Sequence, residues 1–276
     1  MGWRGTLALE YRRRGDQTVV HDRHNGPLRV LRSLHPEGPR ICHSVLVHPP
    51  GGIVGGDVLQ VEATLGAGAH ALLTTPGATR FYRSAGEPAE QSVDVRAEAG
   101  SRLEWLPLET IAYSGCLATS RLRFDLRPGA EMMGWDVVAL GLPASDLPFD
   151  AGTFTQAIEL PGRWIERGVV GAADRRLLDS PLGGAGQRAL GVLWFAAADT
   201  LEPGRRDALL AAARAAAKDH VLAASSGATS PQASVVVLRT LAPGVEPAMD
   251  LLSRVWSAWR RLAWDLEAPF PRVWRT

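Results

Sequence analysis

Carboxylates inside apolar stretches are the residues of this sequence with the clearest potential for chemistry. Asp136 lies within the apolar run 132–140, where the alternation of a strand would place it on one face with Val138 and Leu140. A buried carboxylate is costly unless it is hydrogen-bonded, ion-paired, protonated or in contact with water. Asp57 closes a glycine-rich block and raises the same question if that block is internal. The other carboxylates of interest are Glu104 and Glu109, which flank an apolar run, and Glu166.

These carboxylates have two interpretations. Each one alone is most simply a salt bridge or a turn cap, because arginines are abundant in the chain. Taken together, several carboxylates spaced along a hydrated internal cavity could pass a divalent cation from site to site. Oxygen ligands hold such ions more weakly than thiolates or imidazoles do, and weak successive sites are what transfer requires.

Softer metal ligands are few and scattered. A structural zinc site needs about four ligands, usually in paired short spacings, and no such set occurs here. His21 and His24 form a weak alternative metal site at most, with Cys116 as a soft ligand elsewhere in the chain. Cys42 and His43 would point to opposite faces of a strand, which argues against a shared metal.

Several functional classes find no support in the sequence. It has neither a Gly-x-Ser-x-Gly elbow nor a Gly-x-x-x-x-Gly-Lys-Ser/Thr phosphate loop, and its two cysteines lack a thiol-enzyme signature. The 30 basic and 29 acidic residues leave a net charge of +1, whereas a nucleic-acid-binding face normally needs a basic excess. No signal peptide and no membrane-spanning apolar run is visible, so we expect a cytoplasmic protein.

Two glycine-rich blocks, 48–57 and 74–84, are the most conspicuous features of the chain. Both lie between alternating apolar stretches that read as strands, and glycine at this density allows backbones to approach closely. The conspicuous residues of the blocks are His48, Pro49, Pro50, Gly51, Gly52, Gly55, Gly56, Thr75, Pro76, Gly77, Phe81 and Tyr82.

A two-residue alternation dominates the first two-thirds of the chain and indicates β-sheet. Three alternating strands each run into a small-residue turn, at Gly68, Gly100 and Gly129, and then into another apolar strand. The turns are spaced by about 30 residues, which suggests a recurring hairpin unit. We therefore predict a mainly β fold of stacked, quasi-repetitive antiparallel sheets that form an elongated body.

The last third of the chain changes character. The alanine-rich stretch 202–224 predicts a helix that begins near Pro203, and Val235–Leu238 predicts a short buried strand. A second helix is expected from Pro247 onward. Its apolar stripe, which should pack on the sheet, is Met249, Leu252, Trp256, Trp259 and Leu262. We expect one domain over 1–276, with a β-rich part (1–200) and a helix-containing part (201–276).

Five sequence blocks in order carry a family resemblance. They are the two glycine-rich blocks, Leu103–Ile111 with Trp105, Gly134–Gly141 with Trp135, and Pro271–Thr276. Together these blocks resemble the urease accessory protein D family (UreD, also called UreH) over nearly the whole chain. The resemblance implies a largely β fold with a few helices, in agreement with the patterns above.

The resemblance also implies a function. Members of that family are non-enzymatic scaffolds that bind UreF directly and the GTPase UreG through UreF, and that dock on apo-urease. An internal tunnel is expected to conduct nickel(II) in transit, with no cofactor held tightly. The acidic motif residues of the family match Asp57, Asp136 and Glu166 by position. Other motif positions that the family usually retains match Glu104 and Glu109.

The sequence departs from the family pattern in places, and alternatives stay open. Ser114 stands where an acidic residue is usual, Leu142 where arginine is common, and Asp146 where glycine or glutamate is usual. A purely structural adaptor without ion passage remains one alternative. Another is a β-rich hydrolase that uses Glu104 and Glu109 as a carboxylate pair.

Overall fold

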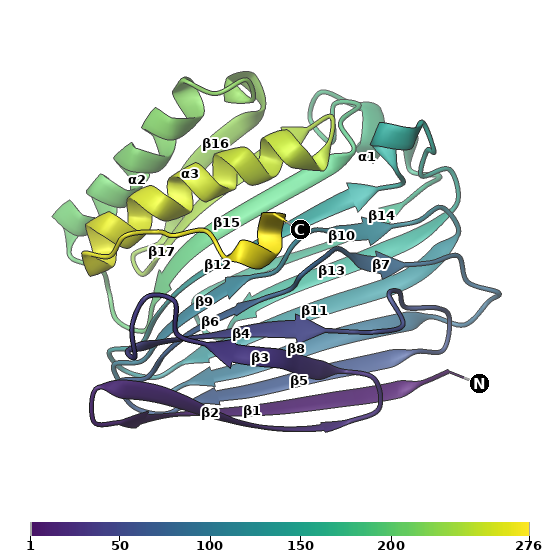
Figure 1. The fold of residues 1–276 in the computed structure, drawn as a ribbon. Helices are drawn as coiled ribbons and strands as arrows, with labels where there is room; N and C mark the ends of the chain where they lie inside the picture. Colours follow the sequence, from purple (N-terminus) through teal and green to yellow (C-terminus); the bar gives the residue numbers. More distant parts are fainter. Residues whose placement is uncertain (1, 276) are drawn as a thin grey trace.

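Two stacked β-sheets form the body of the protein, and helices cover one of them (Figure 1). The computed structural model describes residues 2–275, so Thr276 at the end of the last motif lies outside it. In spatial order, the seven-stranded sheet contains β14 (Trp164–Gly171), β13 (Gly152–Leu160), β11 (Cys116–Leu126), β8 (Ala89–Ala97), β5 (Val58–Leu65), β1 (Arg4–Arg14) and β2 (Gln17–Asn25).

The ten-stranded sheet lies against the seven-stranded one. Its main path is β16 (Ser226–Gln232), β17 (Val235–Ala242), β15 (Ala189–Ala197), β12 (Glu131–Leu140), β9 (Arg102–Leu106), β6 (His70–Thr74), β4 (Ile41–Val47) and β3 (Arg29–Leu34). Beside that path, β10 (Thr110–Ala112) pairs with both β12 and β7 (Thr79–Phe81).

The sequence repeat of about 30 residues corresponds to one coil of a solenoid. The chain passes from β5 to β6, from β8 to β9 and from β11 to β12, and each step crosses from one sheet to the other. The turns pass through Gly68, Gly100 and Gly129, whose φ angles of 66°, 64° and 75° favour glycine. The repeated units are therefore turns between sheets and not hairpins within one sheet.

The prediction of a mainly β fold with stacked sheets is confirmed, but the predicted antiparallel pairing is wrong for the central coils. Strands of successive coils pair in parallel, as β5 does with β8 and β6 with β9. Antiparallel pairs flank them, for example β1–β2 and β13–β14. Alternation of apolar residues is the same for either direction, so the sequence pattern could not distinguish them.

Two apolar layers result from this arrangement. One layer lies between the two sheets, and the other lies between the outer face of the ten-stranded sheet and the helices. Strand β12 contributes to both, since Met132 and Val138 belong to the first layer and Trp135 and Val137 to the second. A strand buried on both faces reads as one continuous apolar run, as 132–140 does.

The helical layer consists mainly of α2 (Pro203–Lys218) and α3 (Val245–Trp264). The predicted helices are confirmed, and the predicted strand forms the first half of β17. Glu202 caps α2, because its carboxylate accepts hydrogen bonds from the backbone N–H groups of Gly204 and Arg205. Among residues 2–275, no helix is both long and apolar enough to cross a membrane.

Two details of the helices differ from expectation. Leu262 is 50% exposed, because it falls about 120° from Trp256 around the helix axis. A short helix that was not predicted, α1 (Arg175–Asp179), also forms, and Asp174 caps it by accepting a hydrogen bond from Leu177 N. Three 3₁₀ turns complete the described chain: η1 (Pro143–Ser145), η2 (Ala223–Ser225) and η3 (Arg272–Arg275).

Gly134 provides a test of packing between the sheets. It faces Trp194 in the register of β12 and β15, and a Cβ at Gly134 would lie 2.4 Å from Cζ2 of that fully buried indole. We expect Gly134→Ala to lower the free energy of unfolding by about 1–3 kcal/mol, measured by urea denaturation. Gly227→Ala is the control, because a Cβ there meets nothing within 4 Å. Equal effects of the two substitutions would refute this account of the packing.

Candidate functional site

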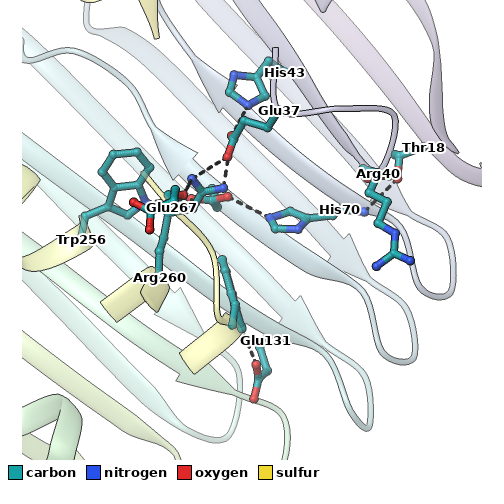
Figure 2. Close-up of polar contacts among 11 residues, drawn as sticks. Thr18, Glu37, Arg40, His43, His70, Glu131, Trp256, Arg260 and Glu267 are labelled. Carbon is teal, nitrogen blue, oxygen red and sulfur yellow. Dashed lines mark hydrogen bonds and ion pairs between the residues drawn. The ribbon is translucent and has the colours of Figure 1, made fainter. Parts of the chain in front are cut away.

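A cluster of buried charges that includes Arg260, Glu37 and His70 lies between the ten-stranded sheet and α3 (Figure 2). Glu104, on β9, belongs to this cluster and is fully buried. His70 Nε2 donates to Glu104 Oε1 over 2.8 Å, and Trp256 Nε1 donates to Oε2 over 2.7 Å. Arg260 Nε lies 3.1 Å from Oε2 as an ion pair. That nitrogen makes no hydrogen bond within the described chain, so the contact is electrostatic.

Arg260 extends the cluster to the loop between β3 and β4. Its Nη1 donates to Glu37 Oε2 over 2.8 Å, and His43 Nε2 donates to Glu37 Oε1 over 2.7 Å. Arg260 also donates to the backbone carbonyl of Glu267. We call His43, Glu37, Arg260, Glu104 and His70 the buried charge cluster. It joins segments from the first and last fifths of the chain.

The shifts in pKa indicate the protonation states of the carboxyl groups in this cluster. Burial alone would raise the pKa of Glu104, but the hydrogen bond from His70 and the charge of Arg260 outweigh it, so the pKa is lowered. The same balance of burial against His43 and Arg260 lowers the pKa of Glu37. Burial lowers the pKa of His70. The carboxylates are therefore ionised and already satisfied by cationic and N–H partners.

Asp136 has a different environment, in the layer between the two sheets. Its Oδ2 accepts a hydrogen bond from Gln156 Nε2 over 2.7 Å, across from β13. Burial raises the pKa of Asp136 to about 6, and no cation offsets it. This carboxyl group therefore changes protonation close to neutral pH, unlike the carboxylates of the buried charge cluster.

Asp136 belongs to a row of polar side chains that crosses the strands. Gln91, Ser120 and Gln156 occupy the same register on β8, β11 and β13. Each lies two residues from a side chain of the inter-sheet core, so each faces inward. We call Gln91, Ser120, Gln156 and Asp136 the interior polar row. It is a polar line through a largely apolar layer.

One end of the interior polar row opens into a cavity of about 360 Å³. Gln91 lines this cavity together with Trp105 and residues of both glycine-rich blocks. The lining residues from the blocks are His48, Pro49, Gly51, Gly52, Ile53, Thr75, Pro76, Gly77, Ala78, Thr79 and Arg80. Burial lowers the pKa of His48, with Asp57 acting in the opposite direction.

The two glycine-rich blocks need glycine where they touch. A Cβ at Gly52 would lie 2.0 Å from the ring of Tyr82, so the first block can approach the second only without a side chain there. The two tryptophan motif residues have separate places. Trp105 lies in the inter-sheet layer, and Trp135 lies in the helical layer, where its Nε1 donates to Pro107 O over 2.6 Å.

The structure places Asp57 as a turn cap. Its Oδ1 accepts from the backbone N–H of Trp3 over 2.7 Å, and its Oδ2 accepts from Val54 N–H over 3.0 Å. The carboxylate is buried, and these contacts tie the first glycine-rich block to the start of β1. Asp57 therefore shapes one wall of the cavity.

Glu166 lies at the opposite margin of the inter-sheet layer. Both of its oxygens contact Arg239 Nε, at 3.1 and 3.0 Å, and thereby bridge β14 of one sheet to β17 of the other. Arg239 occupies the same register row of the ten-stranded sheet as Val192 and Asp136. The interior polar row thus points toward this partly exposed ion pair.

Glu104 and Glu109 do not converge on one open cleft. Glu104 points to the helix side of β9 and is fully buried in its ion pairs. Glu109 is half-buried and lines a separate groove beside α3. The arrangement needed for a carboxylate pair acting on a substrate is therefore not the one observed.

The weak metal-ligand set is also dispersed. His21 and His24 are exposed on β2 and border two different hollows, while Cys116 is buried. Burial raises the pKa of the Cys116 thiol to about 11. Within residues 2–275, no group of three or more histidine, cysteine, aspartate or glutamate side chains could hold a metal ion.

The sequence interpretation missed Arg260, Glu37, His70 and Gln156. Gln156 alternates with Phe154 and Ile158 in its strand, so a polar residue on an apolar face was the available signal. Arg260 follows Trp256 by four residues and therefore lies on the same face of the helix, so the predicted burial of Trp256 was the available signal for Arg260. The partners of Arg260 had no such signal, because they come from distant segments.

Arg260 provides a test of the buried charge cluster. Arg260→Met leaves the carboxylates of Glu37 and Glu104 buried without their cation, so we expect a loss of about 3–5 kcal/mol in unfolding free energy. The control is Arg261→Met, which removes an exposed pair with Glu267 and should cost less than about 1 kcal/mol. Chemical denaturation with tryptophan fluorescence measures both, and similar losses would contradict the assignment.

Asp136 provides a pH-dependent prediction. Its folded pKa of about 6 exceeds the value of about 3.9 for an unfolded aspartate, so its contribution to stability is present below pH 4 and lost as pH rises through 6. Asp136→Asn should therefore be more stable than the parent chain by about 1–3 kcal/mol at pH 7.5, with little difference near pH 4. Urea denaturation at both pH values measures this, and a pH-independent difference would exclude it.

Comparisons with known proteins place the chain among relatives. A family model described as UreD urease accessory protein matches residues 4–275. The chain is 60% identical over 278 residues to the urease accessory protein UreD of Leptothrix cholodnii, with both chains covered completely. It is 58% identical to that of Polaromonas naphthalenivorans, with 99% of each chain covered. The protein of the same name from Variovorax paradoxus is 56% identical, again over both whole chains.

These matches extend over the whole length of the chain and are not confined to the glycine-rich blocks. The predicted family resemblance is therefore confirmed. The chain belongs to the UreD family of urease accessory proteins, and its role lies in urease maturation.

Proposed function

We propose that this chain is a non-enzymatic scaffold that bridges apo-urease to the UreF–UreG accessory complex. We further propose that it passes nickel(II) through the layer between its two sheets. Nickel is then cargo in transit and not a resident cofactor. The cytoplasm, where apo-urease would be synthesised, is the compartment in which such a scaffold would act.

The interior polar row is the observation that carries this proposal. Buried polar groups are less favourable in a sheet core than apolar side chains of the same size, even when they are hydrogen-bonded. Ser120 and Asp136 are nevertheless buried in one register zone, beside the half-buried Gln91 and Gln156. The row begins at a cavity and runs toward the Glu166–Arg239 pair at the opposite margin.

The chemistry of the row suits transfer more than storage. Asp136 offers an anionic oxygen once it loses its proton, and its pKa of about 6 allows this near neutral pH. Ser120 and the two glutamines offer neutral oxygens. Such ligands bind nickel weakly compared with imidazole or thiolate, so an ion could leave each site again.

The other predicted path residues take different roles in this proposal. His48 and Gln91 would meet the ion at the cavity, and Glu166 would meet it at the far margin. Asp57 would hold the first glycine-rich block in place. Glu104 would act structurally, because its oxygens are already bound within the buried charge cluster.

A structural adaptor without ion passage is the second candidate. The observation that favours it is that Asp57, Glu104 and Glu166 all have structural partners. Both candidates require assembly with the urease maturation machinery. They differ only in whether the interior polar row contributes to activation.

Asp136→Asn separates the two candidates. The variant keeps a hydrogen-bonding group beside Gln156 but removes the anionic oxygen, and it should fold at least as well as the parent chain. In cells that coexpress urease, UreF and UreG, we expect the complex to form normally and urease activation to fall by about tenfold or more. Urease activity and its nickel content are measured together with copurification of the complex.

Glu62→Gln is the matched control, because Glu62 is exposed on the outer face of β5. It should leave both assembly and activation unchanged. If the complex that contains Asp136→Asn activated urease normally, ion passage along the interior polar row would be rejected. The structural adaptor would then be the remaining candidate.

A further inference from the structure

A groove of about 590 Å³ lies beside α3, on the helix side of the ten-stranded sheet. Its floor includes Ile111 of β10 and Ala139 of β12, which are neighbours in register. Farther along β12, the same outer face is covered by the helical layer. The two long helices do not extend over this end of the sheet (Figure 1), where Ile111 is half-buried and Ala139 is only 2% exposed.

The walls of the groove are also largely apolar. They come from the first turns of α3, the turn that contains η1, and the C-terminal segment that ends in η3. Phe270 on this wall is 42% exposed. The apolar lining residues are Leu108, Ile111, Ala139, Leu142, Pro143, Ala144, Val245, Pro247, Met249, Phe270 and Trp274. An apolar hollow of this kind, with aromatic side chains, is typical of a protein-binding surface.

The charges around the groove are unbalanced. Glu109 and Glu246 line it and make no ion pair within residues 2–275, whereas Asp250 is paired with Arg254 and with His220. Among the residues that line the groove, the positively charged one is Arg275. Two carboxylates are therefore left to attract cationic groups of whatever occupies the groove.

We propose that this groove binds one amphipathic helix of a partner protein. The apolar side chains of that helix would pack against Ile111 and Met249, and its lysine or arginine side chains would lie beside Glu109 and Glu246. Such a helix would lie next to α3 and extend the helical layer over the rest of the apolar face. Helix in groove is a common mode of recognition for a surface of this shape. The site concerns a surface separate from the interior polar row, and it stands whether or not ions pass between the sheets.

The test uses two designed 18-residue helical peptides with the same leucine face, one with lysine and one with glutamate at the polar positions. Binding of each fluorescently labelled peptide to the full chain is measured by anisotropy. The chain has a net charge of +1, so it has no overall attraction for the lysine peptide. We expect the lysine peptide to bind at least about tenfold more tightly than the glutamate peptide.

Variants locate the binding to the groove. Met249→Asp should weaken binding of the lysine peptide by about tenfold or more. The double variant Glu109→Lys with Glu246→Lys should reverse the preference between the peptides. The control is Leu182→Asp, because Leu182 is 100% exposed and does not line the groove. It should change neither affinity.

Three outcomes would overturn the proposal. They are no binding of the lysine peptide by the folded parent chain, equal binding of both peptides, and a charge-reversal variant that keeps the original preference. Near-ultraviolet circular dichroism of each variant confirms that it is folded. Glu246 is exposed and Glu109 is half-buried at the groove, so the charge-reversal pair tests the site even if Met249→Asp disturbs packing.

Discussion

The buried contact of Arg260 with Glu104 and Glu37 is the interaction on which the remaining arrangement depends. It joins α3 to the ten-stranded sheet through Glu104 and to the loop before β4 through Glu37, which lies 223 residues from Arg260 in the sequence. Charges without water are tolerated only when their partners are held in place. The position of α3 is therefore set by electrostatics as well as by apolar packing, and α3 in turn forms one wall of the groove beside it.

The two apolar layers differ in the partners that they provide for buried carboxyl groups. In the helical layer, carboxylates are matched by arginine, histidine and tryptophan; Glu131, for example, accepts from Trp264 Nε1 over 2.6 Å and from Arg205 over 3.0 Å. In the inter-sheet layer, Asp136 has only an amide partner and a raised pKa. The first pattern stabilises a fixed contact. The second leaves a group whose charge can change, which is a property that the proposed passage of ions would need.

The prediction of the fold succeeded where a local pattern was sufficient. Alternation identified the strands, the spacing of Gly68, Gly100 and Gly129 matched the coil, and Pro203 marked the start of α2. The direction of strand pairing was predicted wrongly, because it depends on whether each turn returns the chain to the same sheet or crosses to the other. That choice is made by the packing of both sheets together and leaves no two-residue signature.

The sequence by itself determined the β-rich class, the two long helices, the family and the presence of Asp136 within an apolar run. Only the tertiary structure separated the predicted carboxylates, placing Asp136 between the sheets, Glu104 against α3, Asp57 in a turn and Glu109 in a groove. The reason is physical. Whether a carboxylate can exchange a proton or an ion depends on its partners, and those of Glu104 and Asp136 come from segments far away in the chain.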